Sequence, residues 1–119
     1  VDAALRAAGA EIGLEHRLEQ ISRTAPVVFD ADCIAAVRAG AKAAGFSMRD
    51  IISGAGHDAA HTAAVVPTTM IFVPSADGLS HNPAESTLPE ECAAGAQVLL
   101  EAVLHYDRQM AETRCEVTA

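Results

Sequence analysis

The histidines and glycines best placed to do chemistry lie in two stretches in the middle of the chain. Residues 52–59 read ISGAGHDA, and residues 78–85 read GLSHNPAE. Each stretch follows a short apolar run, is rich in small and turn-forming residues, and contains one central histidine. Because the loops beyond the strand ends of an open α/β sheet commonly form ligand sites, we expect the two stretches to line one crevice.

In the second stretch, His81 lies among Gly78, Ser80, Asn82 and Pro83. An imidazole held in such a turn is suited to metal binding or to acid–base chemistry. Turn chemistry explains the asparagine and the proline equally well, so a loop histidine without a task remains an open alternative. Glu85 follows four residues later and is predicted to orient His81, or else to be a solvated charge.

In the first stretch, Gly54 and Gly56 allow a sharp turn whose N–H groups point outward at a helix start and hold an anion. A plain tight turn is the alternative, and the third glycine of a dinucleotide-binding fingerprint is absent. His57 and His61 are four residues apart and could share a helical face as a His-x-x-x-His metal pair. The glutamate of a metalloprotease helix is missing, however. Asp58 is interpreted as a residue at the start of a helix, where the helix dipole favours a negative charge.

Composition excludes several classes of protein. The chain has 119 residues, half of them apolar, and a net charge of -8, without a basic cluster for nucleic-acid binding. Three cysteines without a Cys-x-x-Cys pair predict neither a disulfide framework nor a zinc knuckle, which fits a reducing, cytoplasmic setting. No apolar run approaches the roughly 20 residues of a membrane span. No Gly-x-Ser-x-Gly elbow occurs, which disfavours a serine hydrolase.

The hydrophobic pattern predicts an α/β fold. Helices are expected over residues 2–12, from Asp30 or Asp32 to Gly45, over 58–66, and from Thr87 with an apolar stripe formed by Cys92, Ala96, Leu99, Val103, Tyr106 and Met110. Strands are expected over residues 14–23, near 51–52, and over 68–73 in the centre of the sheet. From Glu112 onward the tail shows no periodicity and is expected to fray.

Residues 53–59 (SGAGHDA) and 70–85 together resemble the C-terminal part of the zinc-dependent amidohydrolases of the hydantoinase/carbamoylase family. That family includes N-carbamoyl-L-amino-acid hydrolases and allantoate amidohydrolases. The resemblance implies that residues 1–28 are the last helix and strand of a dimerisation (lid) domain. It also implies that residues 29–119 are the C-terminal part of a mixed-sheet metallohydrolase catalytic domain flanked by helices.

The resemblance also implies roles for individual residues. His81 would ligate one metal of a two-metal site that holds zinc, with manganese, cobalt or nickel as alternatives. Glu85 would support the loop of His81, and Ser80 would present its backbone near the scissile group. His57 and Asp58 would line the same pocket, with Gly54 and Gly56 at the substrate. The implied reaction is hydrolysis of a carbamoyl or ureido C–N bond in a small molecule by a metal-activated water.

The sequence departs from the family pattern in one important respect. The other metal ligands, the catalytic glutamate and the substrate-binding residues of the lid domain have no counterpart here, and one histidine does not hold a catalytic zinc. We therefore expect an inactive piece of a homodimeric enzyme, with the missing N-terminal half as its partner. Two alternatives remain: a non-catalytic α/β remnant or oligomerisation module, and a small anion-binding domain using the turn at Gly54 and Gly56.

Overall fold

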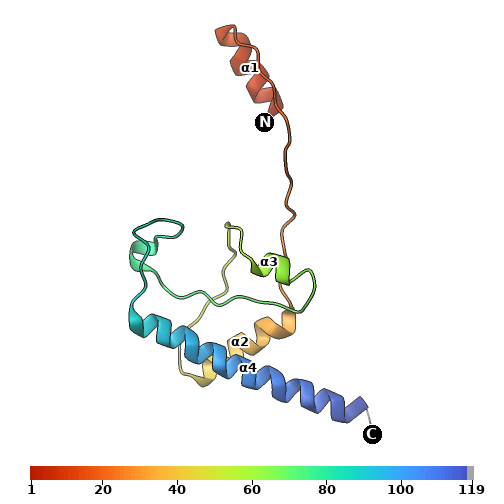
Figure 1. The fold of residues 1–119 in the computed structure, drawn as a ribbon, viewed down its shortest axis with the longest axis vertical. Helices are drawn as coiled ribbons and strands as arrows, with labels where there is room; N and C mark the ends of the chain where they lie inside the picture. Colours follow the sequence, from red (N-terminus) through yellow and green to blue (C-terminus); the bar gives the residue numbers. More distant parts are fainter. Residues whose placement is uncertain (118–119) are drawn as a thin grey trace.

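Helices joined by long extended segments make up the computed structural model, which describes residues 1–117 and side chains up to residue 115. The order is α1 (Asp2–Ile12), α2 (Ala31–Ala43), α3 (Ala59–Thr62), the 3-10 helix η1 (Ala76–Gly78) and α4 (Pro89–Val117), as Figure 1 shows. Residues 118–119, the end of the predicted catalytic segment, lie outside the described residues.

Both ends of α2 follow from local sequence signals. The Asp30 carboxylate accepts a hydrogen bond from the main-chain N–H of Cys33 at 2.8 Å, which satisfies a free donor in the first turn. This hydrogen bond lowers the pKa of Asp30 below its ordinary value of 3.8. The helix closes at Ala44, and Gly45 follows with a φ of 76°, a conformation that favours glycine. The predicted start at Asp30 and stop at Gly45 are confirmed.

The core is the contact between α2 and α4, which lie against each other in Figure 1. Its buried side chains are small: Ala36, Ala41, Val98 and Ala102. At Gly40, a Cβ atom would lie 2.7 Å from the main-chain nitrogen of Ala102 and 2.9 Å from the carbonyl oxygen of Val98. The glycine is therefore needed for the two backbones to approach this closely.

The apolar stripe predicted on the last helix only partly coincides with the face that α4 turns to α2, where its member Tyr106 lies beside Cys33. Leu99 and Val103 remain 55% and 56% exposed, whereas Val98 and Ala102 are buried against α2. The periodicity identified an apolar helix correctly, but α4 carries apolar side chains on more than one face. The small residues fit the close contact with α2, and the larger ones have no covering surface among the described residues.

The helix α4 also extends beyond its predicted end. Residues from Glu112 to Val117 are helical, so the expectation of a frayed tail in that range is wrong. In this last part of α4 a side chain also hydrogen-bonds to the helix backbone: Thr113 Oγ1 donates to the carbonyl of Gln109 at 3.0 Å. Good helix formers continue the helix even where the apolar pattern stops.

The predicted strands do not form within residues 1–117, so the mixed sheet is absent from the described part of the chain. Residues 14–23, 51–52 and 68–73 run extended, but none pairs with a neighbouring strand. A strand exists only through hydrogen bonds to a partner strand, and none is formed by these segments within residues 1–117. The side chain of Ile52 is also fully exposed. The predicted helix over 58–66 is also shorter, because α3 ends at Thr62 and single turns follow to Val66.

The helix α1 stands apart from the remainder, at the far end of the extended segment that leads to α2 (Figure 1). It ends at Gly13 as predicted, with a φ of 70° and a hydrogen bond to the carbonyl of Gly9. The radius of gyration is 21.2 Å, whereas a compact domain of this length would have about 13.5 Å. Within residues 1–117, no helix is both long and apolar enough to cross a membrane.

Candidate functional site

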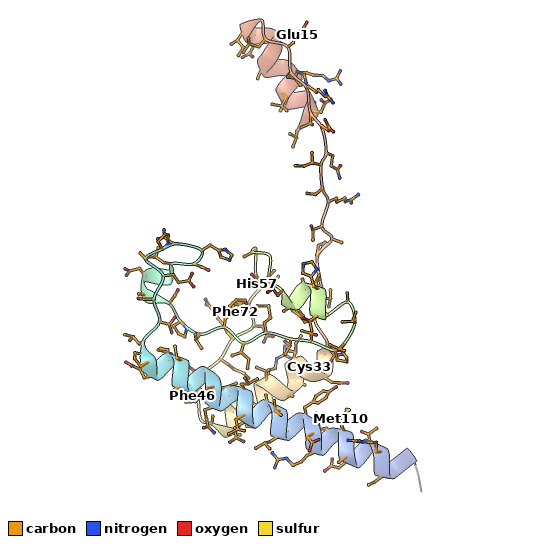
Figure 2. The ribbon with its side chains drawn as sticks, viewed as in Figure 1. Glu15, Cys33, Phe46, His57, Phe72 and Met110 are labelled. Carbon is orange, nitrogen blue, oxygen red and sulfur yellow. The ribbon has the colours of Figure 1, made fainter. Side chains whose placement is uncertain are left out.

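The imidazole of His57 is the centre of a small cluster built from both loops. Its Nε2 atom lies 2.8 Å from Ser53 Oγ. The ring of Phe72 meets it edge-on with centroids 5.4 Å apart, and the ring of His81 lies 6.2 Å away. Figure 2 shows His57 and Phe72 side by side. The two loops therefore meet at these rings, and His57, half-buried, joins them.

The first loop is held by its own serine. Besides contacting His57, Ser53 Oγ accepts a hydrogen bond from the main-chain N–H of Ala55 at 3.2 Å. A Cβ atom on Gly54 or Gly56 would meet nothing within 4 Å, and neither glycine has a positive φ. Open surroundings, not a strained backbone, thus distinguish these two glycines.

Asp58 occupies the N-cap position of α3 without a side-chain cap hydrogen bond. Its carbonyl oxygen accepts from the main-chain N–H of Thr62 at 3.1 Å and from Thr62 Oγ1 at 3.3 Å. The carboxylate is exposed, and the backbone, not the side chain, organises the start of α3. His61, in the last turn of α3, has no ring contact with the His57 cluster in the described structure.

The second loop holds His81 in a left-handed conformation with a φ of 56°. The main-chain N–H of His81 donates to Glu85 Oε2 at 2.8 Å, so the carboxylate fixes the backbone of His81 and not its ring. Asn82 closes the turn, because its side-chain oxygen accepts from Ala84 N and its carbonyl accepts from Glu85 N, both at 2.9 Å. Non-glycine residues in this conformation occur preferentially at functional sites.

The base of the second loop is closed by two further hydrogen bonds. Ser75 Oγ donates to the carbonyl of Leu79 at 2.7 Å, and Ala76 N donates to the carbonyl of Ser86 at 2.8 Å. Between them, Asp77 and Gly78 are left-handed, with φ of 54° and 67°. Ser80 is exposed on this loop beside His81. The loop is therefore a closed turn that presents Ser80 and His81 outward.

The described residues do not by themselves form a complete metal centre. Neither ring nitrogen of His81 is engaged in a hydrogen bond within residues 1–117, which leaves the imidazole available as a ligand. However, no group of three or more histidine, cysteine, aspartate or glutamate side chains is arranged to hold a metal in that same range. A catalytic zinc takes about three protein ligands, more than the described side chains bring together in one place.

The described cysteines are not arranged as nucleophiles. Burial and the nearby Asp30 carboxylate raise the pKa of the Cys33 thiol, which lies beside Tyr106, and burial is also the main cause of the raised pKa of Tyr106. A raised pKa keeps the thiol protonated and unreactive. Cys92, which its place in the predicted apolar stripe of the last helix would bury, is instead exposed on α4.

Sequence reasoning missed two members of the cluster, Ser53 and Phe72. Ser53 belongs to the same motif as His57, four residues before it, a separation that a turn closes. Phe72 was assigned to a strand buried on both faces, yet it is 45% exposed and packs on an imidazole. One signal could have pointed to Phe72: it is an aromatic residue in an apolar run that leads into a histidine-containing loop.

Comparison with known proteins identifies relatives over most of the chain. The profile of peptidase family M20/M25/M40 matches residues 6–105. An N-carbamoyl-L-amino-acid amidohydrolase of Rhizobium meliloti is 46% identical over 93 residues, which are 78% of this chain and 22% of that protein. An allantoate amidohydrolase of Bacillus subtilis is 37% identical over 87 residues, 73% of this chain and 21% of that protein.

A solved structure extends the likeness to the fold. The amidase of the hydantoinase/carbamoylase family from Burkholderia multivorans superposes with a TM-score of 0.76 at 53% sequence identity, covering 88% of this chain and 26% of that one. The chain thus spans about a fifth to a quarter of the length of these relatives. The resemblance to hydantoinase/carbamoylase amidohydrolases is confirmed, and with the profile covering most of its residues the chain belongs to peptidase family M20/M25/M40.

Proposed function

We propose that this chain supplies part of the active site of a metal-dependent amidohydrolase. Its substrate would be an N-carbamoyl-L-amino acid or a ureide such as allantoate, which are the substrates that the names of its relatives give. The observation that carries the proposal is the backbone of His81, which Glu85 holds in a left-handed conformation beside the ring of His57.

In this proposal each loop residue has one role. His81 is a metal ligand, and Glu85 maintains the loop that presents it. His57 and Asp58 line the pocket, and Ser80 offers its main chain next to the scissile bond. Gly54 and Gly56, where an added Cβ atom would meet nothing within 4 Å, lie at the substrate.

Two metal ions, zinc or alternatively manganese, cobalt or nickel, complete the proposed site. A bound metal ion of this kind lowers the pKa of a water molecule and polarises a carbonyl group. The other ligands and a general-base glutamate would come from the N-terminal half of the enzyme. Residues 1–28 would then end the lid domain of a cytoplasmic homodimer, residues 29–119 would complete the catalytic domain, and the chain alone would be inactive.

Reconstitution tests this function directly. The chain is combined with the N-terminal region of the Burkholderia multivorans amidase, and ammonia release from N-carbamoyl amino acids and from allantoate is measured with and without added zinc or manganese. We expect metal-dependent release that His81→Asn reduces to background. Asparagine tolerates the left-handed backbone, so this variant removes the ligand without straining the loop. His61→Asn is the matched control and should retain activity.

A non-catalytic role as a folded remnant or oligomerisation module is the second candidate. The exposed apolar side chains of α4, among them Leu100 and Leu104 at 53% and 47% exposure, favour an interaction surface. A well-assembled complex without ammonia release would support this candidate and contradict the first. An anion-binding domain has weaker support, because neither Gly54 nor Gly56 adopts the left-handed conformation of an anion nest.

A further inference from the structure

We propose that Ser53 is a positioning residue that determines which ring nitrogen of His57 is offered to a ligand. The hydroxyl of Ser53 donates to Nε2, so the imidazole carries its proton on Nδ1 and presents Nδ1–H as a hydrogen-bond donor. The nature of the ligand rests on the proposed function. The arrangement of Ser53 and His57 is independent of the proposed function.

The bonding capacity of the serine oxygen leads to this assignment. A hydroxyl has one hydrogen and two lone pairs. The main-chain N–H of Ala55 donates to one lone pair at 3.2 Å, and the only acceptor that the structure places against Ser53 Oγ within residues 1–117 is His57 Nε2, at 2.8 Å. The second lone pair could accept from Nε2–H in the other tautomer, but only donation to Nε2 gives the hydroxyl hydrogen a partner within residues 1–117. A neutral imidazole that accepts at one nitrogen carries its proton on the other.

The surroundings of the ring leave one nitrogen for a ligand. Phe72 packs edge-on at an interplanar angle of 66°, which fixes the plane of the imidazole, while Ser53 occupies Nε2. Within residues 1–117, Nδ1 has no hydrogen-bond partner. A molecule bound at His81, whose ring centroid is 6.2 Å away, would be within reach of this donor.

A donor at this point selects an oxygen acceptor on the ligand. A carbonyl or carboxylate oxygen of a carbamoyl or ureido compound would accept from Nδ1–H, whereas the opposite tautomer would offer only a lone pair there. Ser53 would then act on the substrate through His57 without touching it. This separates Ser53 from His57 and His81, which face the ligand themselves.

The tautomer is measured on the chain itself, without metal or substrate. Long-range ¹H–¹⁵N spectra of the ¹⁵N-labelled protein, recorded above the titration range of histidine, distinguish Nδ1–H from Nε2–H at His57. We expect Nδ1–H in the unmodified chain and a change of about fivefold in the tautomer ratio in Ser53→Ala, the effect of one hydrogen bond of ordinary net strength. Ser53→Thr keeps a hydroxyl and should preserve the Nδ1–H form.

Phe72→Leu is the matched control, because it removes the ring contact and leaves the serine in place. It should retain the Nδ1–H form. An Nε2–H tautomer in the unmodified chain, or equal ratios with serine and alanine at position 53, would overturn the assignment.

The reconstituted enzyme supplies the second readout. Ser53→Ala should change kcat/KM with unchanged metal content, and Ser53→Thr should restore it. Equal kcat/KM in the active unmodified enzyme and in Ser53→Ala would refute a positioning role. If no combination of chains releases ammonia, the proposed function fails, and the spectra still decide which nitrogen Ser53 engages.

Discussion

The contact between α2 and α4 and the pair of histidine loops are stabilised in opposite ways. The two helices bury Ala36, Ala41, Val98 and Ala102 against each other, and their backbones nearly touch at Gly40. The loops bury no side chain fully and depend on short-range hydrogen bonds, such as the one between Ser53 and His57 and the one from the His81 N–H to Glu85. Packing across long sequence distances defines the first region, and polar contacts between residues at most ten apart define the second.

This difference shows which parts of the site the chain carries on its own. The conformation of each loop is encoded locally, so His81 takes its left-handed backbone without a surrounding core. The relative position of the loops depends on ring contacts at His57, supplied by Phe72 and His81. Helix packing provides the support, and the loops carry the candidate site residues.

The largest expected effect comes from breaking the helix contact at Gly40. In Gly40→Ala the new Cβ atom would overlap the backbone of Ala102 and Val98, which cannot move aside as a flexible side chain can. We expect a loss of about 1–3 kcal/mol in the free energy of unfolding, as for other overpacked sites. Urea unfolding followed by far-UV circular dichroism measures this loss.

Gly54→Ala is the matched control, since its Cβ would meet nothing within 4 Å. It should alter the free energy of unfolding by less than about 0.5 kcal/mol, as at other open surface positions. If Gly40→Ala instead stabilises the protein, as alanine does in an exposed helix, the close contact of α2 and α4 is refuted.

A smaller effect is expected from removing the carboxylate that holds His81. Glu85→Ala deletes the acceptor of the His81 N–H, so hydrogen exchange of that amide should accelerate by about fivefold, corresponding to roughly 1 kcal/mol for one hydrogen bond. Glu85→Gln retains an oxygen acceptor and should exchange more slowly than the alanine variant. Equal exchange rates in all three proteins would show that Glu85 does not hold the loop.

The smallest expected effect is the pH dependence of α2. The pKa of Asp30 is lowered in the folded protein by the hydrogen bond from Cys33, so its contribution is complete above the ordinary value of 3.8. The contribution disappears as the pH falls through the lower, folded pKa. The thermal unfolding midpoint of the unmodified chain should therefore decline as the pH falls from 3.8 through the lower pKa of Asp30 in the folded protein.

Asp30→Asn separates charge from capping, because asparagine is also a good N-cap but does not titrate there. Arg38 lowers the pKa of Asp50 as well, so the difference between the two proteins, not the curve of one, isolates Asp30. Parallel pH curves for the unmodified chain and Asp30→Asn would contradict this account.

The end of α1 and both ends of α2 were predictable from the sequence because their signals are local. Asp30 caps α2, and Gly13 and Gly45 take left-handed conformations just past helix ends, as expected. Each signal acts within one helical turn and needs no other part of the protein. The faces of α4 were not predictable, since burial depends on which surface meets α2.

The strands and the site required information that the sequence pattern lacks. An apolar run such as residues 68–73 predicts a strand only if a neighbour is present to pair with it, and none lies within residues 1–117. The family motifs identified His57, His81 and Glu85, but not that Ser53 and Phe72 orient His57. The metal and substrate roles stay predictions for the reconstituted enzyme.

The extended segment between α1 and α2 has a consequence for how the molecule moves in solution. With a radius of gyration of 21.2 Å, the chain has the dimensions of a compact protein of about 390 residues. In gel filtration and small-angle scattering, its apparent size would therefore greatly exceed that expected for 12.3 kDa. A retention volume alone would imitate an oligomer, so mass must be measured independently, for example by light scattering, before subunits are counted.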